Sequence, residues 1–256
     1  MTTDQDMNVR AFEVKGADGC MIRGDRLDGV DRQVLFITGF LSKRWGNKSK
    51  ALAQWCQERG WGFSCYDVRG FGDSDGRFRD YTLSDWIADA RVVLASLQTG
   101  PPITVVGNSL GSWIAWLIAR EHELIERLIM VAPAFNMMGV RAGSISEDRR
   151  QAWRKTGWMP WDDDPLHKDW PLAWKWVEES ESSWNDSFHR LRPVKTTIVH
   201  GLQDKVIHFR GSVEFAERLS VIHPGFPVEL LLVPGDHRLS APEHMERLRR
   251  LVIEVE

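Results

Sequence analysis

The pentapeptide at residues 107–111, Gly-Asn-Ser-Leu-Gly, constrains this chain more than any other stretch. It follows an apolar run at residues 103–106 that has the length and composition of a buried strand, and a long apolar helical stretch comes after it. A serine at the apex of a sharp strand-to-helix turn has strained backbone geometry, and neighbouring chain passes very close to it. Glycines on both sides leave the room that this requires. The pattern therefore predicts that Ser109 is a nucleophile at the end of a strand.

A nucleophilic serine needs a histidine as base and a carboxylate that orients the histidine. Where the serine occupies such a turn, the carboxylate and then the histidine follow it in the chain. Asp204 comes shortly after an apolar run at residues 196–201, and His237 comes shortly after another at residues 228–233. Because α/β sheets build their sites at the carboxyl ends of strands, both side chains are expected beside Ser109. The sequence predicts a triad of Ser109, Asp204 and His237.

Two other places for the orienting carboxylate are less suitable. Residues 133–139 follow a strand expected at residues 127–132, but they contain no carboxylate. Asp236 precedes His237 directly, and adjacent residues in such a turn rarely point at one another. Asp236 is therefore expected to cap the turn, which leaves Asp204 as the predicted acid.

The other histidines are expected to have structural roles. His200 ends a strand and is expected to pack near Asp204, whereas His208 is expected to line the mouth of the site. The remaining histidines lie in helical or loop stretches without a preceding strand: His122, His167, His189, His223 and His244.

A serine nucleophile also needs two backbone N–H donors where the oxyanion of a tetrahedral intermediate will form. One is expected from Leu110, which follows the nucleophile and opens a helix whose N-terminus carries free N–H groups and positive charge. The second normally comes from the loop after the third strand, here residues 38–42. Gly39 permits a turn there, and Phe40 is the predicted donor, with Leu41 as the alternative. The Phe40 side chain can also form a wall of the pocket.

Length and charge limit the classes of protein that the chain can be. Its 256 residues suit one large α/β domain or a domain with a small cap, and 43% of them are hydrophobic. A net charge of −3 gives no electrostatic reason to bind nucleic acid. No apolar run reaches the roughly 20 residues that a membrane span requires, so no stable membrane insertion is expected. Residues 1–6 have neither the basic nor the apolar region of a targeting signal, which predicts a cytoplasmic location.

The sequence gives no sign of a metal or an organic cofactor. The three cysteines, Cys20, Cys56 and Cys65, lack metal-ligand spacing and are expected to be reduced thiols. Residues 73–76 lack the spaced ligands and the closing glutamate of a calcium loop. The three aspartates at residues 162–164 are expected to form a solvated turn.

Apolar strands alternate with helical stretches in the manner of a doubly wound sheet. An opening hairpin is expected at residues 9–15 and 20–26, and a buried strand at residues 34–39. A helix at residues 48–59, a further strand at residues 63–67 and a second helix at residues 82–98 precede the nucleophile strand. Residues 136–194 interrupt this alternation with a helical insert. The predicted division is therefore a core of residues 1–135 and 195–256 with a cap of residues 136–194.

The cap is rich in tryptophan. It contains seven of the thirteen tryptophans of the chain: Trp153, Trp158, Trp161, Trp170, Trp174, Trp176 and Trp184. They can form the core of a small cap, or they can form an apolar roof over an acyl group. The sequence leaves both hypotheses open, and both can hold for different tryptophans.

Several stretches resemble the small acyl-protein thioesterase branch of the α/β-hydrolase family, which includes palmitoyl-protein thioesterases and acyl-glucuronide esterases. They are residues 39–42, 46–52, 67–76, 107–113, 200–204 and 235–238. The resemblance implies a mostly parallel eight-stranded sheet flanked by helices, with a small helical cap. It also assigns nucleophile, acid and base to Ser109, Asp204 and His237, and oxyanion donors to Phe40 and Leu110.

The expected activity is hydrolysis of a carboxylic ester or thioester through an acyl-enzyme on Ser109, without a cofactor. The substrate is expected to be a small ester, an acyl thioester or an acylated protein. Hydrolysis of carbon–carbon bonds in diketones also uses a serine and stays an alternative. A ligand-binding protein without catalytic activity is a weaker alternative, because a pure binder has no need of all three triad groups.

Overall fold

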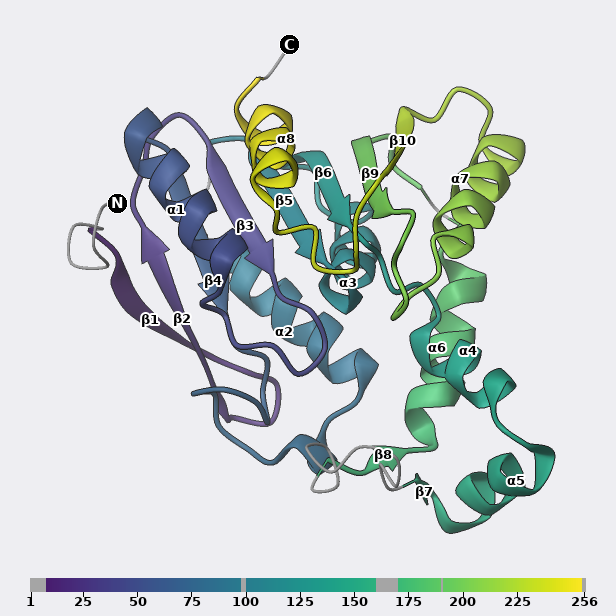
Figure 1. Cartoon of the computed structure of the whole chain (residues 1–256). Helices are drawn as coiled ribbons and strands as arrows, with labels where there is room; N and C mark the ends of the chain where they lie inside the picture. Colours follow the sequence, from purple (N-terminus) through teal and green to yellow (C-terminus); the bar gives the residue numbers. More distant parts are fainter. Residues whose placement is uncertain (1–7, 98–99, 160–169, 190, 255–256) are drawn as a thin grey trace.

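A computed structural model of the chain describes residues 8–97, 100–159, 170–189 and 191–254. Its centre is an eight-stranded sheet in the order β1-β2-β4-β3-β5-β6-β9-β10 (Figure 1). The first two strands form an antiparallel hairpin and β2 pairs antiparallel with β4, whereas every later pairing is parallel. The strands of this sheet are β1 (Arg10–Lys15), β2 (Met21–Leu27), β3 (Gln33–Ile37), β4 (Gly62–Tyr66), β5 (Ile103–Asn108), β6 (Ile125–Val131), β9 (Lys195–Gly201) and β10 (Val228–Val233).

Helices cover both faces of the sheet (Figure 1). They are α1 (Asn47–Arg59), α2 (Leu83–Ala95), α3 (Leu110–Ala119), α4 (Met137–Ser144), α5 (Glu147–Thr156), α6 (Lys175–Asp186), α7 (Arg210–Ile222) and α8 (Pro242–Ile253), with a short 3-10 turn η1 (Phe78–Asp80). Buried side chains of α1 and α8 belong to one apolar cluster, and those of α2, α3 and α7 belong to the other. The molecule therefore has two cores, one on each side of the sheet.

The central strands are apolar on both faces because both faces are covered. In β3, Leu35 and Ile37 join the cluster with α2 and α3, whereas Val34 and Phe36 join the cluster with α1 and α8. Successive side chains of a strand point to opposite faces, so a continuous apolar run can supply two cores at once. Every residue of β3 is buried. The uninterrupted apolar runs in the sequence follow from this position in the sheet.

The segment between β6 and β9 leaves the sheet and contains α4, α5 and α6. Figure 1 shows α4 and α6 together beside α3 and α7, with α5 at the far end of the molecule. A two-stranded pair, β7 (Trp158–Met159) and β8 (Leu172–Ala173), lies next to α5. The sequence predicted the helices but not this small pair. Trp161, His167 and the three aspartates at residues 162–164 lie outside the described residues.

The boundaries differ slightly from those expected. The third strand ends at Ile37 rather than at residue 39, and the helix expected at residues 82–98 covers Leu83–Ala95. Gly39 instead packs against the end of β5, where a Cβ would stand 3.1 Å from the Cβ of Ser109. The strand stops early because the chain must turn across the neighbouring strand end.

The described residues were expected to contain neither a membrane-spanning helix nor a metal site. No helix in the described part of the chain is both long and apolar enough to cross a membrane. Among the same residues, no three His, Cys, Asp or Glu side chains gather as metal ligands would.

Candidate active site

Ser109 occupies the turn between β5 and α3. Its backbone has φ 55° and ψ −121°, a strained conformation for a residue with a side chain. The Ser109 N–H donates to the carbonyl of Val131 at 2.8 Å, and the Ser109 carbonyl accepts from the N–H of Ala134 at 3.1 Å. Val131 ends β6 and Ala134 lies just after it, so the end of the neighbouring strand holds the turn in place.

The glycines on both sides of Ser109 are required by the backbone around them. A Cβ on Gly107 would stand 2.3 Å from the Cα of Ser112, and one on Gly111 would stand 2.2 Å from the carbonyl oxygen of Ile37. Neither contact can be relieved by moving a flexible side chain, because both involve main-chain atoms. The close approach expected from the sequence is present in the structure.

The three residues of the predicted triad are joined by hydrogen bonds. His237 Nε2 lies 3.1 Å from Ser109 Oγ, and His237 Nδ1 lies 2.7 Å from Asp204 Oδ2. Asp204 follows β9 and His237 follows β10, so three strand ends of the parallel part of the sheet supply the three side chains. This arrangement allows a proton to pass from the serine hydroxyl to the imidazole while the carboxylate fixes the ring.

The Asp204 carboxylate is buried and held as an anion. Burial alone favours its neutral form, but hydrogen bonds from the N–H of Ile207, from His237 and from the N–H of Val206 outweigh this and lower the pKa of Asp204. Both amides donate to Oδ1 at 2.8 Å. The side chain therefore presents a negative charge to His237 at neutral pH.

His200 also contacts Asp204, as expected from its position at the end of β9. Its ring is fully buried, and Nε2 lies 3.1 Å from Asp204 Oδ2 and 3.0 Å from the carbonyl oxygen of Ile207. Nδ1 lies 2.7 Å from Ser212 Oγ on α7. Burial lowers the pKa of His200 despite the nearby carboxylate. The sequence predicted the proximity to Asp204 but gave no signal for Ser212, which comes from a separate helix.

Two other predictions can be compared with the geometry. Asp236 accepts hydrogen bonds at Oδ1 from the N–H groups of Arg238 and Leu239, both at 3.0 Å, so it caps the turn as expected. His208 is exposed, its ring stacks on Phe209, and its Nδ1 accepts from the N–H of Arg210. These contacts place His208 in its own loop rather than against the triad.

The loop that carries Phe40 passes directly beside Ser109. Gly39 approaches so closely that its absent Cβ would be 3.1 Å from the Ser109 Cβ. Leu41 has a φ of 52°, which turns the loop sharply after Phe40. On the other side of the serine, Leu110 is the first residue of α3, and N–H groups in the first turn of a helix have no acceptor within it. The two predicted oxyanion donors therefore belong to segments that flank Ser109.

Backbone strain is concentrated at this edge of the sheet. The non-glycine residues with positive φ in the described part of the chain are Leu41, Ser109, Ala132, Asn136 and Leu239. They follow β3, β5, β6 and β10, all at the carboxyl ends of parallel strands. Unusual backbone of this kind persists where surrounding structure determines it, and it is common at functional sites.

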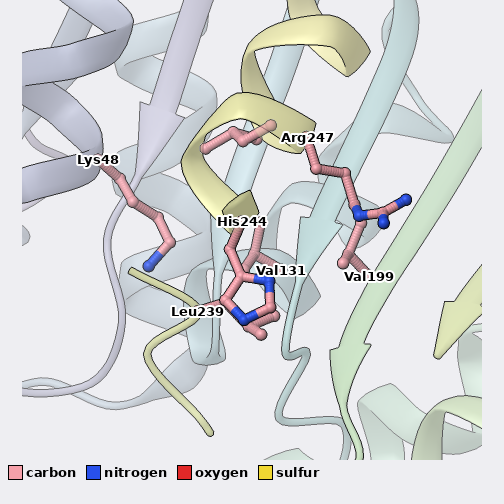
Figure 2. Close-up of a pocket in the computed structure, with 7 residues that line it drawn as sticks. Lys48, Val131, Val199, Leu239, His244 and Arg247 are labelled. Carbon is pink, nitrogen blue, oxygen red and sulfur yellow. The ribbon is translucent and has the colours of Figure 1, made fainter. Parts of the chain in front are cut away.

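Lys48 connects α1 to the loop that carries His237. Its Nζ donates to the carbonyl oxygen of Arg238. The side chain borders a small cavity of about 10 Å³ beneath this loop, and Figure 2 shows the His244 ring projecting into the same region from α8. Burial lowers the pKa of Lys48 to about 8; Arg238 adds to the effect and Asp236 opposes it. Lys48 thus ties the loop that carries His237 to α1.

The tryptophans of the segment between β6 and β9 fall into two groups. Trp153 is buried, and its ring meets that of Trp174 at a centroid distance of 5.5 Å within this segment. Trp176 instead packs against Trp86 at 4.8 Å and against Phe40 at 5.8 Å. The first pair is local packing, whereas Trp176 joins an aromatic cluster beside the predicted oxyanion loop. Packing within the segment holds for Trp153 and Trp174, whereas an apolar roof over an acyl group stays a hypothesis.

Comparisons with known proteins agree with this architecture. Palmitoyl-protein thioesterase ABHD10, mitochondrial, is 27% identical in Bos taurus over 237 residues, covering 87% of this chain and 72% of that protein. The Mus musculus protein of the same name is 29% identical over 223 residues, covering 84% and 72%. The solved structure of alpha/beta hydrolase domain-containing protein 10 from mouse superposes with a TM-score of 0.84 at 22% identity, covering 96% of this chain and 97% of that one. This last likeness confirms the predicted α/β-hydrolase fold.

A family model matches residues 29–158, which include the predicted oxyanion loop, the nucleophile turn and the start of the segment after β6. The match covers half of the chain. This chain therefore belongs to the Hydrolase_4 family, described as serine aminopeptidase S33, within the α/β-hydrolases.

Proposed function

We propose that this chain hydrolyses carboxylic esters or thioesters through an acyl-enzyme on Ser109. The observation that carries the proposal is the unbroken line of hydrogen bonds from Ser109 Oγ through His237 to Asp204. A nucleophile, a base within reach of it and a group that orients the base are the parts that acyl transfer needs. Membership of a hydrolase family supports the same conclusion.

The first half of the reaction forms the acyl-enzyme. His237 Nε2 takes the hydroxyl proton while Ser109 Oγ attacks the carbonyl carbon, and Asp204 stabilises the resulting imidazolium. The N–H groups of Phe40 and Leu110 hold the oxyanion, and loss of one such donor typically costs about 10²–10³ in kcat. The tetrahedral intermediate collapses, and His237 gives its proton to the leaving alcohol or thiol.

The second half releases the acid. His237 takes a proton from a water molecule, which attacks the acyl carbon, and Ser109 leaves with that proton. The depressed pKa of Asp204 keeps the carboxylate charged throughout.

The proposed substrate is an acyl thioester with a long chain. Two observations support this choice: the curated relatives are named palmitoyl-protein thioesterases, and aromatic side chains gather beside Phe40. Phe40 meets Phe78, Trp86 and Trp176 at centroid distances of 5.8–5.9 Å. An acyl group that contacts Phe40 would lie next to this apolar cluster, which favours an alkyl chain over a polar acyl group.

The test is kcat/KM on matched oxygen esters and thioesters from acetyl to palmitoyl, with Ser109→Ala as the blank. His208→Ala is the matched control, because this exposed histidine lies outside the triad. We expect turnover by the wild type and the control, none by Ser109→Ala, and a rise with thioester chain length. Turnover retained in pure Ser109→Ala protein rules out the acyl-enzyme. A preference for short oxygen esters would rule out the substrate proposal alone.

Labelling by a fluorophosphonate tests the nucleophile separately from the choice of substrate. The reagent forms a covalent bond only with an activated serine, so the wild-type protein is expected to be labelled at Ser109. Ser112, three residues further on, is fully buried and serves as an internal control. A chain that binds ligands without catalysis would remain unlabelled.

A further inference from the structure

His200 has no step in the proposed mechanism, yet the protein satisfies both nitrogens of its ring. The side chain has no solvent exposure, and β9 delivers it to the same carboxylate oxygen that His237 contacts. Asp204 Oδ2 thus lies between two imidazoles, at 3.1 Å from His200 Nε2 and 2.7 Å from His237 Nδ1.

The partners of His200 determine its protonation state. The carbonyl oxygen of Ile207 can only accept a hydrogen bond, so Nε2, at 3.0 Å, carries a proton. The Ser212 hydroxyl, 2.7 Å from Nδ1, can either donate to this nitrogen or accept from it. Burial lowers the pKa of His200 and so favours the neutral ring, in which Nδ1 carries no proton and accepts from Ser212. Its Nε2–H is directed at both Ile207 and Asp204.

We propose that His200 is a positioning residue for the triad. Its neutral Nε2–H fixes the orientation of the Asp204 carboxylate toward His237 and stabilises part of the negative charge of that carboxylate. The inference rests on the proposed function, because it assigns His200 a role in that reaction. His200 touches neither the substrate nor the reacting atoms.

The donor count at Asp204 explains how this works. Oδ1 accepts from the N–H groups of Val206 and Ile207, and Oδ2 accepts from the two histidines. An ionised carboxylate offers about four lone-pair positions, and here all of them are used. Rotation of the carboxylate would break bonds on both oxygens at once. The orientation of His237 therefore depends on His200 as well as on Asp204.

Loss of the His200 donor has a predictable electrostatic consequence. A carboxylate that accepts fewer hydrogen bonds carries more of its charge toward the remaining donor and stabilises a charged partner more strongly. His237 would then keep its second proton to higher pH. Asp204 and His237 are the titratable groups whose charges act on His200, and Lys205 and His208 on the same loop are exposed.

The experiment compares His200→Met, which removes both nitrogens, with His200→Gln, whose amide nitrogen can reach the position of Nε2. The exposed His208→Gln is the matched control. Two quantities are measured in each protein: the acid limb of the pH profile of kcat/KM, and the titration midpoint of His237 followed by NMR on the histidine-labelled, substrate-free protein. The second needs no turnover, so it decides the inference even if the proposed function fails.

We expect His200→Met to shift the acid limb and the NMR midpoint upward by about 0.5 pH unit, and to lower kcat about tenfold, since one hydrogen bond to a charged group is lost. His200→Gln should show less than half of that shift, and His208→Gln none. An unshifted midpoint in folded His200→Met overturns the proposal. An equal shift of the His237 midpoint in His200→Gln and His200→Met overturns the donor role, because the effect would then come from the packing of the side chain alone.

Ser212→Ala provides an independent variant that keeps the imidazole and its volume. It removes the hydroxyl that donates to Nδ1, which weakens Nε2–H as a donor, so a smaller upward shift is expected. If His200→Met does not fold, this variant decides the question. An unchanged His237 midpoint in Ser212→Ala then overturns the proposal.

Discussion

The carboxyl edge of the sheet and the helical segment between β6 and β9 are built by different rules. At the edge, a Cβ on Gly107 or Gly111 would stand 2.3 or 2.2 Å from neighbouring main-chain atoms. In the other segment, a Cβ on Gly143 of α4 would meet nothing within 4 Å. One region requires particular residues because the backbone leaves no alternative. The other is held by large aromatic side chains, whose contact is less specific.

The two regions tolerate substitution to different degrees. Apolar contact depends on area and volume, and cores tolerate substitutions that keep both. A hydrogen-bonded line such as Ser109–His237–Asp204 depends on atoms of one type at one distance. We therefore expect changes at the edge to abolish activity, and changes in the helical segment to alter stability or substrate choice.

Among variants that keep the Ser109 hydroxyl, the largest effect is expected from Asp204→Asn. The amide keeps the shape of the side chain but does not favour the required tautomer of His237, so kcat should fall by about 10⁴. The measurement is kcat on the best thioester, with circular dichroism to show that the fold is retained. A loss of less than tenfold would mean that the edge is less specific than its geometry implies.

Trp176→Ala tests the helical segment at a buried contact with the core. The ring is almost fully buried, and its Nε1–H donates to the carbonyl of Tyr81 at 3.2 Å. Truncation should lower the free energy of unfolding by about 3–5 kcal/mol. Trp158→Ala is the matched control, since this tryptophan is 36% exposed. Urea denaturation measures both, and equal losses would contradict the distinction between the two tryptophans.

The glycines give the most direct comparison of the two regions. Gly107→Ala places a methyl group against the backbone of Ser112 and should cost about 1–3 kcal/mol of stability, together with activity. Gly143→Ala lies within α4, where space is open, and should stabilise by about 0.5–1 kcal/mol. Thermal unfolding and kcat/KM report both effects. Equal behaviour of the two variants would remove the contrast between the regions.

The smallest effect concerns acid stability. Burial lowers the pKa of His200 below its ordinary 6.5, so the unfolded chain binds this proton more readily than the folded one. The contribution of His200 to stability is complete above pH 6.5 and is lost as the pH falls below it. His200→Gln removes the titrating group, so its free energy of unfolding should fall less between pH 7 and 5 than that of the wild type. A steeper fall in His200→Gln would reverse the assigned sign.

The sequence contained enough to predict the fold and the three residues that meet at the site. Ser109, Asp204 and His237 lie within hydrogen-bond distance as expected, because the topology of a parallel sheet brings their strand ends together, and their catalytic roles stay predictions. The bond from His200 to Ser212 could not be predicted, because α7 brings Ser212 there only when it packs on the sheet. The short pair of β7 and β8 was missed because strands of two residues have no usable periodicity.

The tryptophans show a different limit. Their number predicted aromatic packing, but not which of them would face the neighbourhood of Phe40. Trp153 and Trp176 are equally buried, at 1% exposure each, and only their partners distinguish them. Partners depend on how α5 and α6 are placed, and a pattern along one helix does not contain that information.

The complete burial of α3 has a consequence for synthesis on the ribosome. Every residue of α3 is buried, and the indole N–H groups of Trp113 and Trp116 both point at Ser187, which follows α6. While the first half of the chain is emerging, this very apolar helix has no complete cover. Until residues beyond 187 have left the exit tunnel, the part of this helix that they cover in the folded protein stays open to water, so α3 completes its burial late in synthesis.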